Sequence, residues 1–308
     1  MPSTDAHACR LQRRLTALPT RTRKRAWPPH QCFLFGIRLL TLCIARRYAI
    51  SYPDNLSLSN LTYFVFAPTL CYQPSYPLSP RFRPRWLLRR LAELAVFGAL
   101  MALIIEQYML PAARNSAGAF SERPLRPLRC AERLLKLSIP TLYVWLCIFY
   151  CFFHCWLNAL GELLRFGDRG FYREWWNATT IEQYWRLWNI PVHKWLTRHV
   201  YFPAMRHGFT RTQALSVTFF FSASVHELLI GVPCHVLRGW AFMGIMAQVP
   251  LIALTEWTAR KLKNDQAGNV IFWLSFCIFG QPMAVLLYYM DVMARTQGAA
   301  AFAAEKRA

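Results

Sequence analysis

The sequence lacks the short motifs that identify several common enzyme classes. It contains no G-x-S-x-G nucleophile elbow, no P-loop and no G-x-G-x-x-G turn, which argues against the hydrolases and nucleotide-binding enzymes that carry them. His226 and Glu227 begin an H-E-x-x-H pattern, but Ile230 stands where the second zinc-binding histidine would be required. The catalytic schemes that depend on these motifs therefore fit the sequence poorly.

Acidic residues are also scarce. The 308 residues include 15 aspartates and glutamates against 36 lysines and arginines, a formal net charge of +21. Such an excess can indicate a nucleic-acid-binding protein, but no soluble basic module can be separated from the apolar segments, so we expect no nucleic acid partner. Basic loops between apolar segments more naturally meet membrane lipids and anionic substrates.

The ten cysteines form no disulfide framework. Cys147, Cys151 and Cys155 recur every four residues, so they share one helix face, with His154 beside them. This is not a zinc-finger spacing. We interpret the three cysteines as small packing residues in a membrane helix and expect no metal; a metal site is the alternative.

Residues 1–31 are rich in arginine, with Asp5 as their one acidic residue, and no apolar stretch follows Met1. This is unlike a secretory signal peptide and has some transit-peptide character; a basic tail, or a start that is not the native one, is the alternative. Residues 32–50 are apolar but carry three arginines, which makes a poor span and favours an interfacial helix.

Apolar sequence is abundant: 55% of the residues are hydrophobic, and 12 are tryptophans. A helix needs roughly 20 apolar residues to cross a bilayer, and these blocks lack the alternation of barrel strands. We predict an all-α, polytopic transmembrane protein with about five to six spans plus amphipathic interfacial helices. The five clearest predicted spans are residues 91–110, 139–161, 214–236, 240–257 and 270–292.

His226 and Glu227 lie inside the apolar block 214–236. Ionisable residues in a bilayer are costly and mark functional sites. At about 1.5 Å per residue, His226 lies about 18 Å into its span and Gln281 about 16 Å into the last one, both near mid-membrane. Ser222 is one turn before His226 on the same face. These positions predict a buried polar chamber.

The loop after the second predicted span interleaves aromatic and polar residues, reading FYREWWNATTIEQYWRLWNIPVHKWLTRHVYF over 171–202. Trp and Tyr favour the membrane interface. Residues 180–188 are expected to form an amphipathic helix that ends before Pro191. Such a surface suits an amphiphile with a charged head and an acyl chain; aromatic anchoring alone is the alternative.

Seven stretches carry a family pattern: FYREWWN (171–177), WNIPVHKWLTRH (188–199), SASVHELL (222–229), FAPTLCY (66–72), RLLKLSIP (133–140), WAFMGIMAQVPL (240–251) and FGQPMAVLLYY (279–289). They resemble the diacylglycerol O-acyltransferases of the membrane-bound O-acyltransferase superfamily. The resemblance is collinear over about 52–293. The FYxxWWN element is shared with the sterol O-acyltransferase subfamily, whereas IPVHKW favours the diacylglycerol enzymes.

The resemblance implies transfer of an acyl group from acyl-CoA, as co-substrate, to the hydroxyl of diacylglycerol in the endoplasmic reticulum membrane, with no cofactor. It implies that His226 is the general base and that Asn189 is the signature asparagine, able to stabilise an oxyanion. The residues it implies around the chamber are Glu227, Gln281, Ser222 and His193; for Glu227, a paired structural carboxylate is the alternative. Those implied to contact acyl-CoA or the interface are Trp188, Lys194, Arg198, His199, Phe171, Tyr172, Trp175, Trp176 and Asn177.

Upstream of about residue 52 the resemblance ends. We therefore divide the chain into a basic tail and weak apolar segment outside the family pattern (1–51), an acyltransferase core (52–293) and a C-terminal tail (294–308). The family has further helices before residue 52 that contribute to dimers, so the N-terminal part is expected to be missing or replaced, and homo-oligomer formation is an open possibility. The alternatives are a non-catalytic truncated relative that binds acyl-CoA or modulates a full-length partner, and a sterol O-acyltransferase.

Overall fold

A computed structural model describes residues 52–121, 126–262 and 265–305. Within these ranges the chain consists of α-helices, π-helical segments and one 3-10 turn, with a single isolated bridge between Leu78 and Phe166. The predicted all-α class is confirmed. The predictions for residues 1–51 lie outside the described residues.

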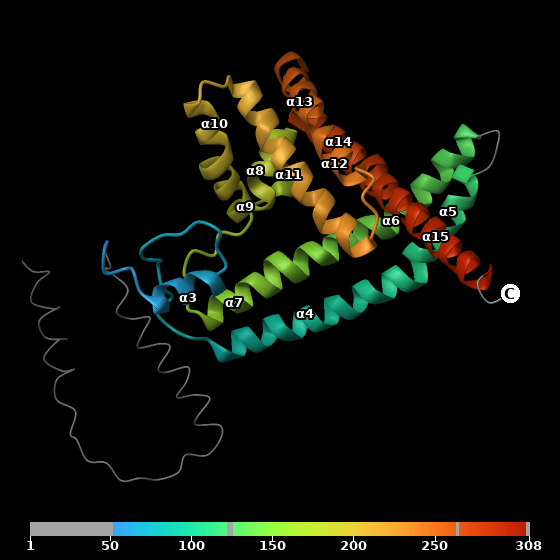
Figure 1. Ribbon diagram of the computed structural model, residues 1–308. Helices are drawn as coiled ribbons and strands as arrows, with labels where there is room; N and C mark the ends of the chain where they lie inside the picture. Colours follow the sequence, from blue (N-terminus) through green and yellow to red (C-terminus); the bar gives the residue numbers. More distant parts are fainter. Residues whose placement is uncertain (1–51, 122–125, 263–264, 306–308) are drawn as a thin grey trace, which may run out of the picture. The chain divides into compact units, whose positions relative to one another are not determined.

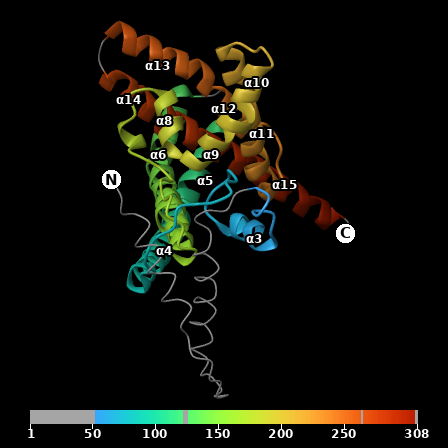
Figure 2. The same cartoon turned by 90° about the vertical axis from the view of Figure 1, so that its left-hand side faces the viewer.

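The first helices are α3 (Leu58–Phe66) and α4 (Pro84–Ile104), which continues through the π-helical segment η2 (Ile105–Met109) into α5 (Leu110–Ser121). One long helix follows, made of α6 (Pro127–Phe149), the π-helical η3 (Tyr150–Trp156) and α7 (Leu157–Leu163). Figures 1 and 2 show α4 running beside this helix. A hydrogen bond joins the two helices: the Tyr150 hydroxyl in η3 donates to the Glu93 carboxylate in α4 at 2.9 Å.

A group of short helices comes next: the 3-10 turn η4 (Trp175–Asn177), α8 (Ile181–Trp188), α9 (Ile190–Leu196), the π-helical η5 (Thr197–Tyr201) and α10 (Phe202–Arg206). The helix α8 begins after Thr180, whose Oγ1 accepts from the Gln183 N–H at 3.1 Å. The predicted helix over 180–188 therefore forms, and Pro191 lies in the first turn of α9, where a missing N–H is tolerated.

The last part of the chain contains α11 (Arg211–Cys234), α12 (Trp240–Met246), α13 (Gln248–Leu262), α14 (Asp265–Trp273), the π-helical η6 (Leu274–Gly280) and α15 (Gln281–Glu305). A capping box starts α11: Thr210 Oγ1 accepts from the Gln213 N–H, and Gln213 Oε1 accepts from the Thr210 N–H at 2.9 Å. The predicted C-terminal tail at 294–308 continues α15 to Glu305; the domain division itself stays a prediction.

Three helices among the described residues are long and apolar enough to cross a membrane: Pro127–Leu163, Arg211–Cys234 and Gln266–Thr296. They contain all or nearly all of the predicted spans 139–161, 214–236 and 270–292. The predicted span 91–110 is not among them; it lies in α4, η2 and the first residue of α5, and it contains Glu93 and Glu106. The number of spans is therefore approximate.

The predicted span 240–257 is wrong as one continuous helix. A turn at Ala247 separates α12 from α13. Pro250 lies in the first turn of α13, where it has no N–H to bond to the turn before it. An apolar run of suitable length thus bends into two helices because one residue cannot continue the hydrogen-bond ladder.

The loop after α7 is held by a carboxylate with no exposed surface. Glu162 is 0% exposed and accepts from the Arg83 N–H at 2.6 Å, from Arg83 Nη2 at 2.9 Å and from Arg169 Nη1 at 2.7 Å. A buried charge is tolerated only when it is paired and hydrogen-bonded. This triad fixes the start of α4 against the loop that leads to the aromatic segment.

Candidate active site

His226 lies in α11 and is half-buried. Its Nδ1 is 2.8 Å from the carbonyl oxygen of Ser222, one turn earlier, and 3.5 Å from the Ser222 Oγ. A carbonyl can only accept, so Nδ1 carries the ring proton when the imidazole is neutral. The other nitrogen, Nε2, is then an acceptor, as a general base requires.

Glu227 is occupied by four donors. Its Oε1 accepts from the Gly239 N–H at 2.8 Å, and its Oε2 accepts from the N–H groups of Ala241 and Phe242 and from the Tyr288 hydroxyl at 2.8 Å. These bonds cap the first turn of α12 and join α11 to α12 and α15. The geometry supports the paired structural carboxylate, the alternative left open by the sequence.

Asn189 stands at the corner between α8 and α9. Its Oδ1 accepts from the Val192 N–H at 3.2 Å and so caps α9. The cap orients the amide, because the oxygen faces the α9 N–H groups and the NH₂ group faces elsewhere. Among the described residues no acceptor is bonded to its two side-chain N–H groups, which suits a group that stabilises an oxyanion.

Gln281 is the first residue of α15 and follows the π-helical η6. Within η6 the carbonyl oxygen of Ser275 lies close to Gly280: a Cβ added at Gly280 would be 2.9 Å from that oxygen, so a side chain at this position would be crowded. The Oε1 of Gln281 is buried and has no hydrogen-bond partner among the described residues. A buried acceptor without a donor costs about 1–3 kcal/mol, so a bound donor, such as a substrate hydroxyl, would remove a penalty.

The helices α8 and α9 pack against the half of α11 that precedes His226. The ring of Trp185 lies 5.8 Å from that of Phe219, and Trp195 lies 5.6 Å from Phe221. This brings the Asn189 corner and α11 into one group of helices. Within the described part of the chain, no hydrogen bond joins His226 to Asn189 or Gln281, so their predicted meeting at one chamber stays a prediction.

The basic residues that follow Asn189 are mostly exposed. Lys194, Arg198 and His199 are exposed, and Lys194 forms an ion pair with Asp168 at 3.4 Å. His193 is half-buried; burial, followed by the charge of Arg186, lowers the pKa of its imidazole, although Glu182 opposes the shift. The exposed cations can meet phosphates, whereas a neutral His193 favours uncharged contacts.

The aromatic residues of the 171–188 segment divide into a buried and an exposed set. Phe171 and Trp175 are each 1% exposed and pack in the interior, not at the interface. Trp188 is partly buried and stacks on Trp145, with ring centroids 4.7 Å apart. Trp176 is 40% exposed, and Asn177 is also exposed. The sequence identified the segment but could not separate these sets, since core and interface use the same residue types.

A second polar group in the long helix was not predicted from the sequence. His154, in η3, contacts Arg90 through Nε2 and the Tyr172 hydroxyl through Nδ1 at 2.7 Å. Arg90 pairs with Glu93 at 2.8 Å. In the sequence, His154 stood out only as a neighbour of three cysteines. The available signal for a polar group here was the pair Arg90 and Glu93, whose spacing of three residues places both side chains on one face of α4.

Comparison with known proteins identifies the family of this chain. The sequence matches the model of the membrane-bound O-acyltransferase family (MBOAT) over residues 13–290. The match begins well upstream of residue 52 and does not support the expectation that residues 1–51 lie outside the family pattern or that the N-terminal part is missing or replaced.

Curated relatives are similar over most of this chain. Diacylglycerol O-acyltransferase 1B of Glycine max is 54% identical over 269 residues, which cover 85% of this chain and 52% of that protein. Diacylglycerol O-acyltransferase 1 of Corylus americana is 56% identical (79% of this chain, 45% of that protein), and that of Bos taurus is 46% identical (80% and 49%). The chain thus spans about half the length of the curated relatives it matches, and it belongs to the membrane-bound O-acyltransferase family.

Proposed function

We propose that this chain is an acyl-CoA-dependent O-acyltransferase of the endoplasmic reticulum membrane, which converts diacylglycerol and acyl-CoA into triacylglycerol and CoA. The observation that carries the proposal is the hydrogen bond from His226 Nδ1 to the Ser222 carbonyl. It leaves Nε2 as the basic nitrogen inside a membrane helix. The relatives named diacylglycerol O-acyltransferase support the acceptor.

The reaction needs a base because a neutral hydroxyl is a weak nucleophile. His226 Nε2 accepts the hydroxyl proton as the acceptor oxygen attacks the thioester carbonyl, a contribution of about 10²–10⁴ in rate. The carbonyl oxygen becomes an oxyanion, to which the amide of Asn189 donates. The carbon–sulfur bond then breaks, and the CoA thiolate takes the proton back from the imidazolium.

The remaining predicted residues have supporting roles in this scheme. Lys194, Arg198 and His199 offer exposed cations to the phosphates of acyl-CoA. Gln281 offers a buried acceptor to a hydroxyl group. Glu227 fixes α12 and α15 to the helix that carries the base. No cofactor or metal takes part in the scheme.

Two alternatives make different predictions. A non-catalytic relative that binds acyl-CoA or modulates a full-length partner would bind the thioester without forming product. A sterol O-acyltransferase would acylate a sterol in place of diacylglycerol, but none of the three relatives described above bears such a name. We also propose that the chain can form a homo-oligomer, although the reaction scheme above does not require one.

The test uses microsomes that contain the full chain, supplied with labelled acyl-CoA and either diacylglycerol or a sterol. We expect labelled triacylglycerol from the wild type and none above background from His226→Ala. His207→Ala, which changes an exposed histidine at the end of α10, is the matched control and should retain activity. Acyl-CoA binding without any product would support the non-catalytic alternative instead.

A further inference from the structure

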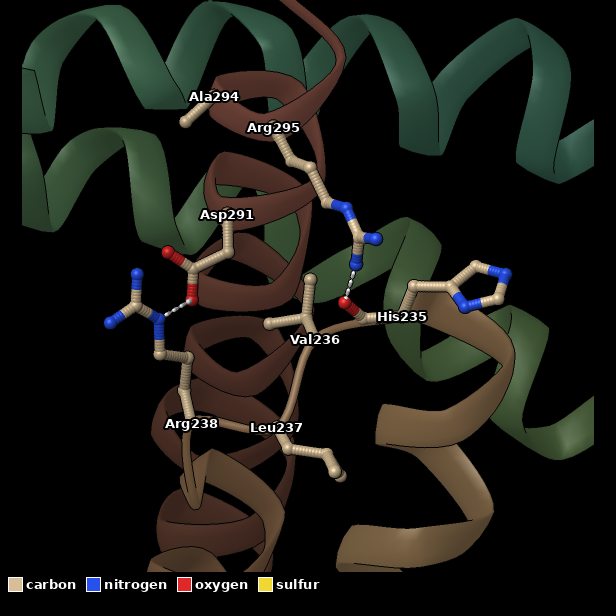
Figure 3. A pocket seen from close by; sticks show the side chains of 7 residues that line it. All are labelled: His235, Val236, Leu237, Arg238, Asp291, Ala294 and Arg295. Atoms are coloured by element: carbon tan, nitrogen blue, oxygen red, sulfur yellow. Dashed lines mark hydrogen bonds and ion pairs between the residues drawn. The ribbon is translucent and has the colours of Figure 1, made fainter. Parts of the chain in front are cut away.

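A cleft of about 400 Å³ opens between the α11–α12 loop and the middle of α15 (Figure 3). Residues 235–238 line one side, and Asp291, Ala294 and Arg295 line the other. The first of these residues comes nine positions after His226, about two and a half helical turns further along the chain. The cleft is therefore separate from the residues assigned to acyl transfer.

The wall formed by the loop is well packed. Val236 is 7% exposed and belongs to one apolar cluster with Ala241 and Tyr288. The side chain of Leu237 folds back over Gly231, where an added Cβ would lie 2.5 Å from Leu237 Cδ2 and 2.7 Å from the Val236 carbonyl oxygen. Leu237 nevertheless stays 63% exposed, so the cleft has a fixed wall and an apolar rim.

Positive charge predominates in the cleft. Asp291 Oδ2 accepts from Trp240 Nε1 at 2.7 Å and lies 4.0 Å from Arg238 Nε, while Arg295 donates to the His235 carbonyl (Figure 3). These contacts use one N–H group of each guanidinium, which has five. The Arg238 side chain is 67% exposed, and Arg295 is exposed. Among the described residues, most of their N–H donors are thus left without a partner, and Asp291 is the one carboxylate that lines the cleft.

The cleft also lies where two membrane-length stretches end. Residues 270–290 carry no Asp, Glu, Lys or Arg, a length of about 30 Å at about 1.5 Å per residue, and Asp291 follows directly. The candidate span Arg211–Cys234 ends one residue before His235. Both ends meet at the cleft, which therefore lies at the level where lipid headgroups begin.

We propose that this cleft binds the phosphate of an anionic phospholipid headgroup, with the acyl chains against the exposed side chains of Leu237 and Val232. Arginine presents paired N–H groups that match phosphate oxygens, and basic pockets between membrane helices are suited to anionic headgroups. The proposal does not depend on the acyltransferase activity, because it uses none of the reacting residues.

Lipid binding is tested on the purified full chain in neutral detergent, without acyl-CoA, by counting dioleoyl phosphatidate adducts with native mass spectrometry. We expect Arg238→Gln and Arg295→Gln each to weaken binding about tenfold, the loss of one hydrogen-bonded charge. Arg114→Gln removes the same charge from an exposed position on α5 and is the matched control. Equal binding by all three variants and the wild type would overturn the proposal.

Asp291→Asn should change phosphatidate binding in the opposite direction to the arginine variants. It keeps an oxygen for Trp240 and removes the one negative charge of the cleft, so phosphatidate binding should rise by roughly fivefold. A damaged fold cannot produce that gain. If Arg295→Gln folds poorly in a thermal unfolding assay, Arg295→Lys is used in its place, because it keeps the charge and should fold and retain most of the phosphatidate binding. A folded Arg295→Lys variant that has lost binding would contradict a phosphate site. Phosphatidate binding by Asp291→Asn equal to that of the wild type would contradict it as well.

Two further ligands identify the source of the phosphate. A large excess of inorganic phosphate should leave phosphatidate bound, because the lipid also gains from its chains; displacement would mean a free-anion site and overturn the lipid assignment. Dioleoylglycerol has the same chains and no phosphate, and its binding should be insensitive to Arg238→Gln. Sensitivity equal to that of phosphatidate would show that the arginines do not act on phosphate.

Discussion

Two histidines lie in helices that are long and apolar enough to cross the membrane, and their ring nitrogens are used differently. His154 has both nitrogens engaged, one by Arg90 and one by Tyr172. His226 has Nδ1 engaged by the Ser222 carbonyl, which leaves Nε2 as an acceptor. Our proposal therefore makes His226 the reacting ring, because its Nε2 has no hydrogen-bond partner among the described residues, whereas both nitrogens of His154 have one.

The largest expected effect is on enzymatic rate, which should depend on His226 and not on His154. His226→Ala should lower the rate of triacylglycerol formation by about 10²–10⁴, with the thermal unfolding midpoint close to that of the wild type. The rate is measured in microsomes and normalised to folded protein. If His154→Ala lowered the normalised rate as much as His226→Ala, the distinction between the two rings would be wrong.

The next effect concerns the amide that complements His226. Asn189→Asp keeps an oxygen that can cap α9 through the Val192 N–H but loses the N–H donors. We expect the rate to fall by about 10²–10³ with little change in unfolding. A variant that folds normally and keeps wild-type turnover would mean that Asn189 only caps the helix.

His154→Ala should lower the stability of the fold and leave the rate of the reaction per folded molecule nearly unchanged. It leaves the Tyr172 hydroxyl and Arg90 without their shared partner, at a cost of about 1–3 kcal/mol in the free energy of unfolding. The measurement is thermal or denaturant unfolding in detergent, with His207→Ala as control. An unfolding midpoint equal to that of the control would show that the His154 contacts contribute nothing to stability.

The smallest effect is a pH dependence at His193. Burial lowers the pKa of its imidazole below the ordinary value of 6.5, so the unfolded chain binds a proton more readily than the folded chain. Its contribution to stability is fully present above pH 6.5 and is lost as pH falls below that value. His193→Gln should lose less stability than the wild type on acidification from neutral pH; identical pH profiles would contradict the shift.

Much of the fold was predictable because it depends on composition along one segment. Apolar length identified the three helices that are long enough to cross a membrane, and the amphipathic run before Pro191 identified α8. The break at Ala247 was missed because apolar content masked the effect of Pro250, a single residue.

The candidate site was predictable only in its residue identities. The family resemblance implied His226 as the base, which stays a prediction, and the contacts of Glu227 depend on donors from residues 239–242 and on Tyr288, which lies 61 positions away. The unpartnered oxygen of Gln281 likewise depends on every neighbour that surrounds it. Such facts belong to tertiary contacts, which a single sequence does not record.

The wide turn of η6 bears on how this helix tolerates changes in chain length. A π-helical segment holds one residue more than the α-helix would need, so the flanking parts keep their facing directions across it. Removing one residue within 274–280 should tighten that turn and leave Trp273 and Tyr288 beside their present neighbours. The same deletion in the regular helix after Gln281 would turn every later side chain by about 100° and separate Tyr288 from Glu227, a difference that the unfolding midpoints of the two deletion variants would reveal.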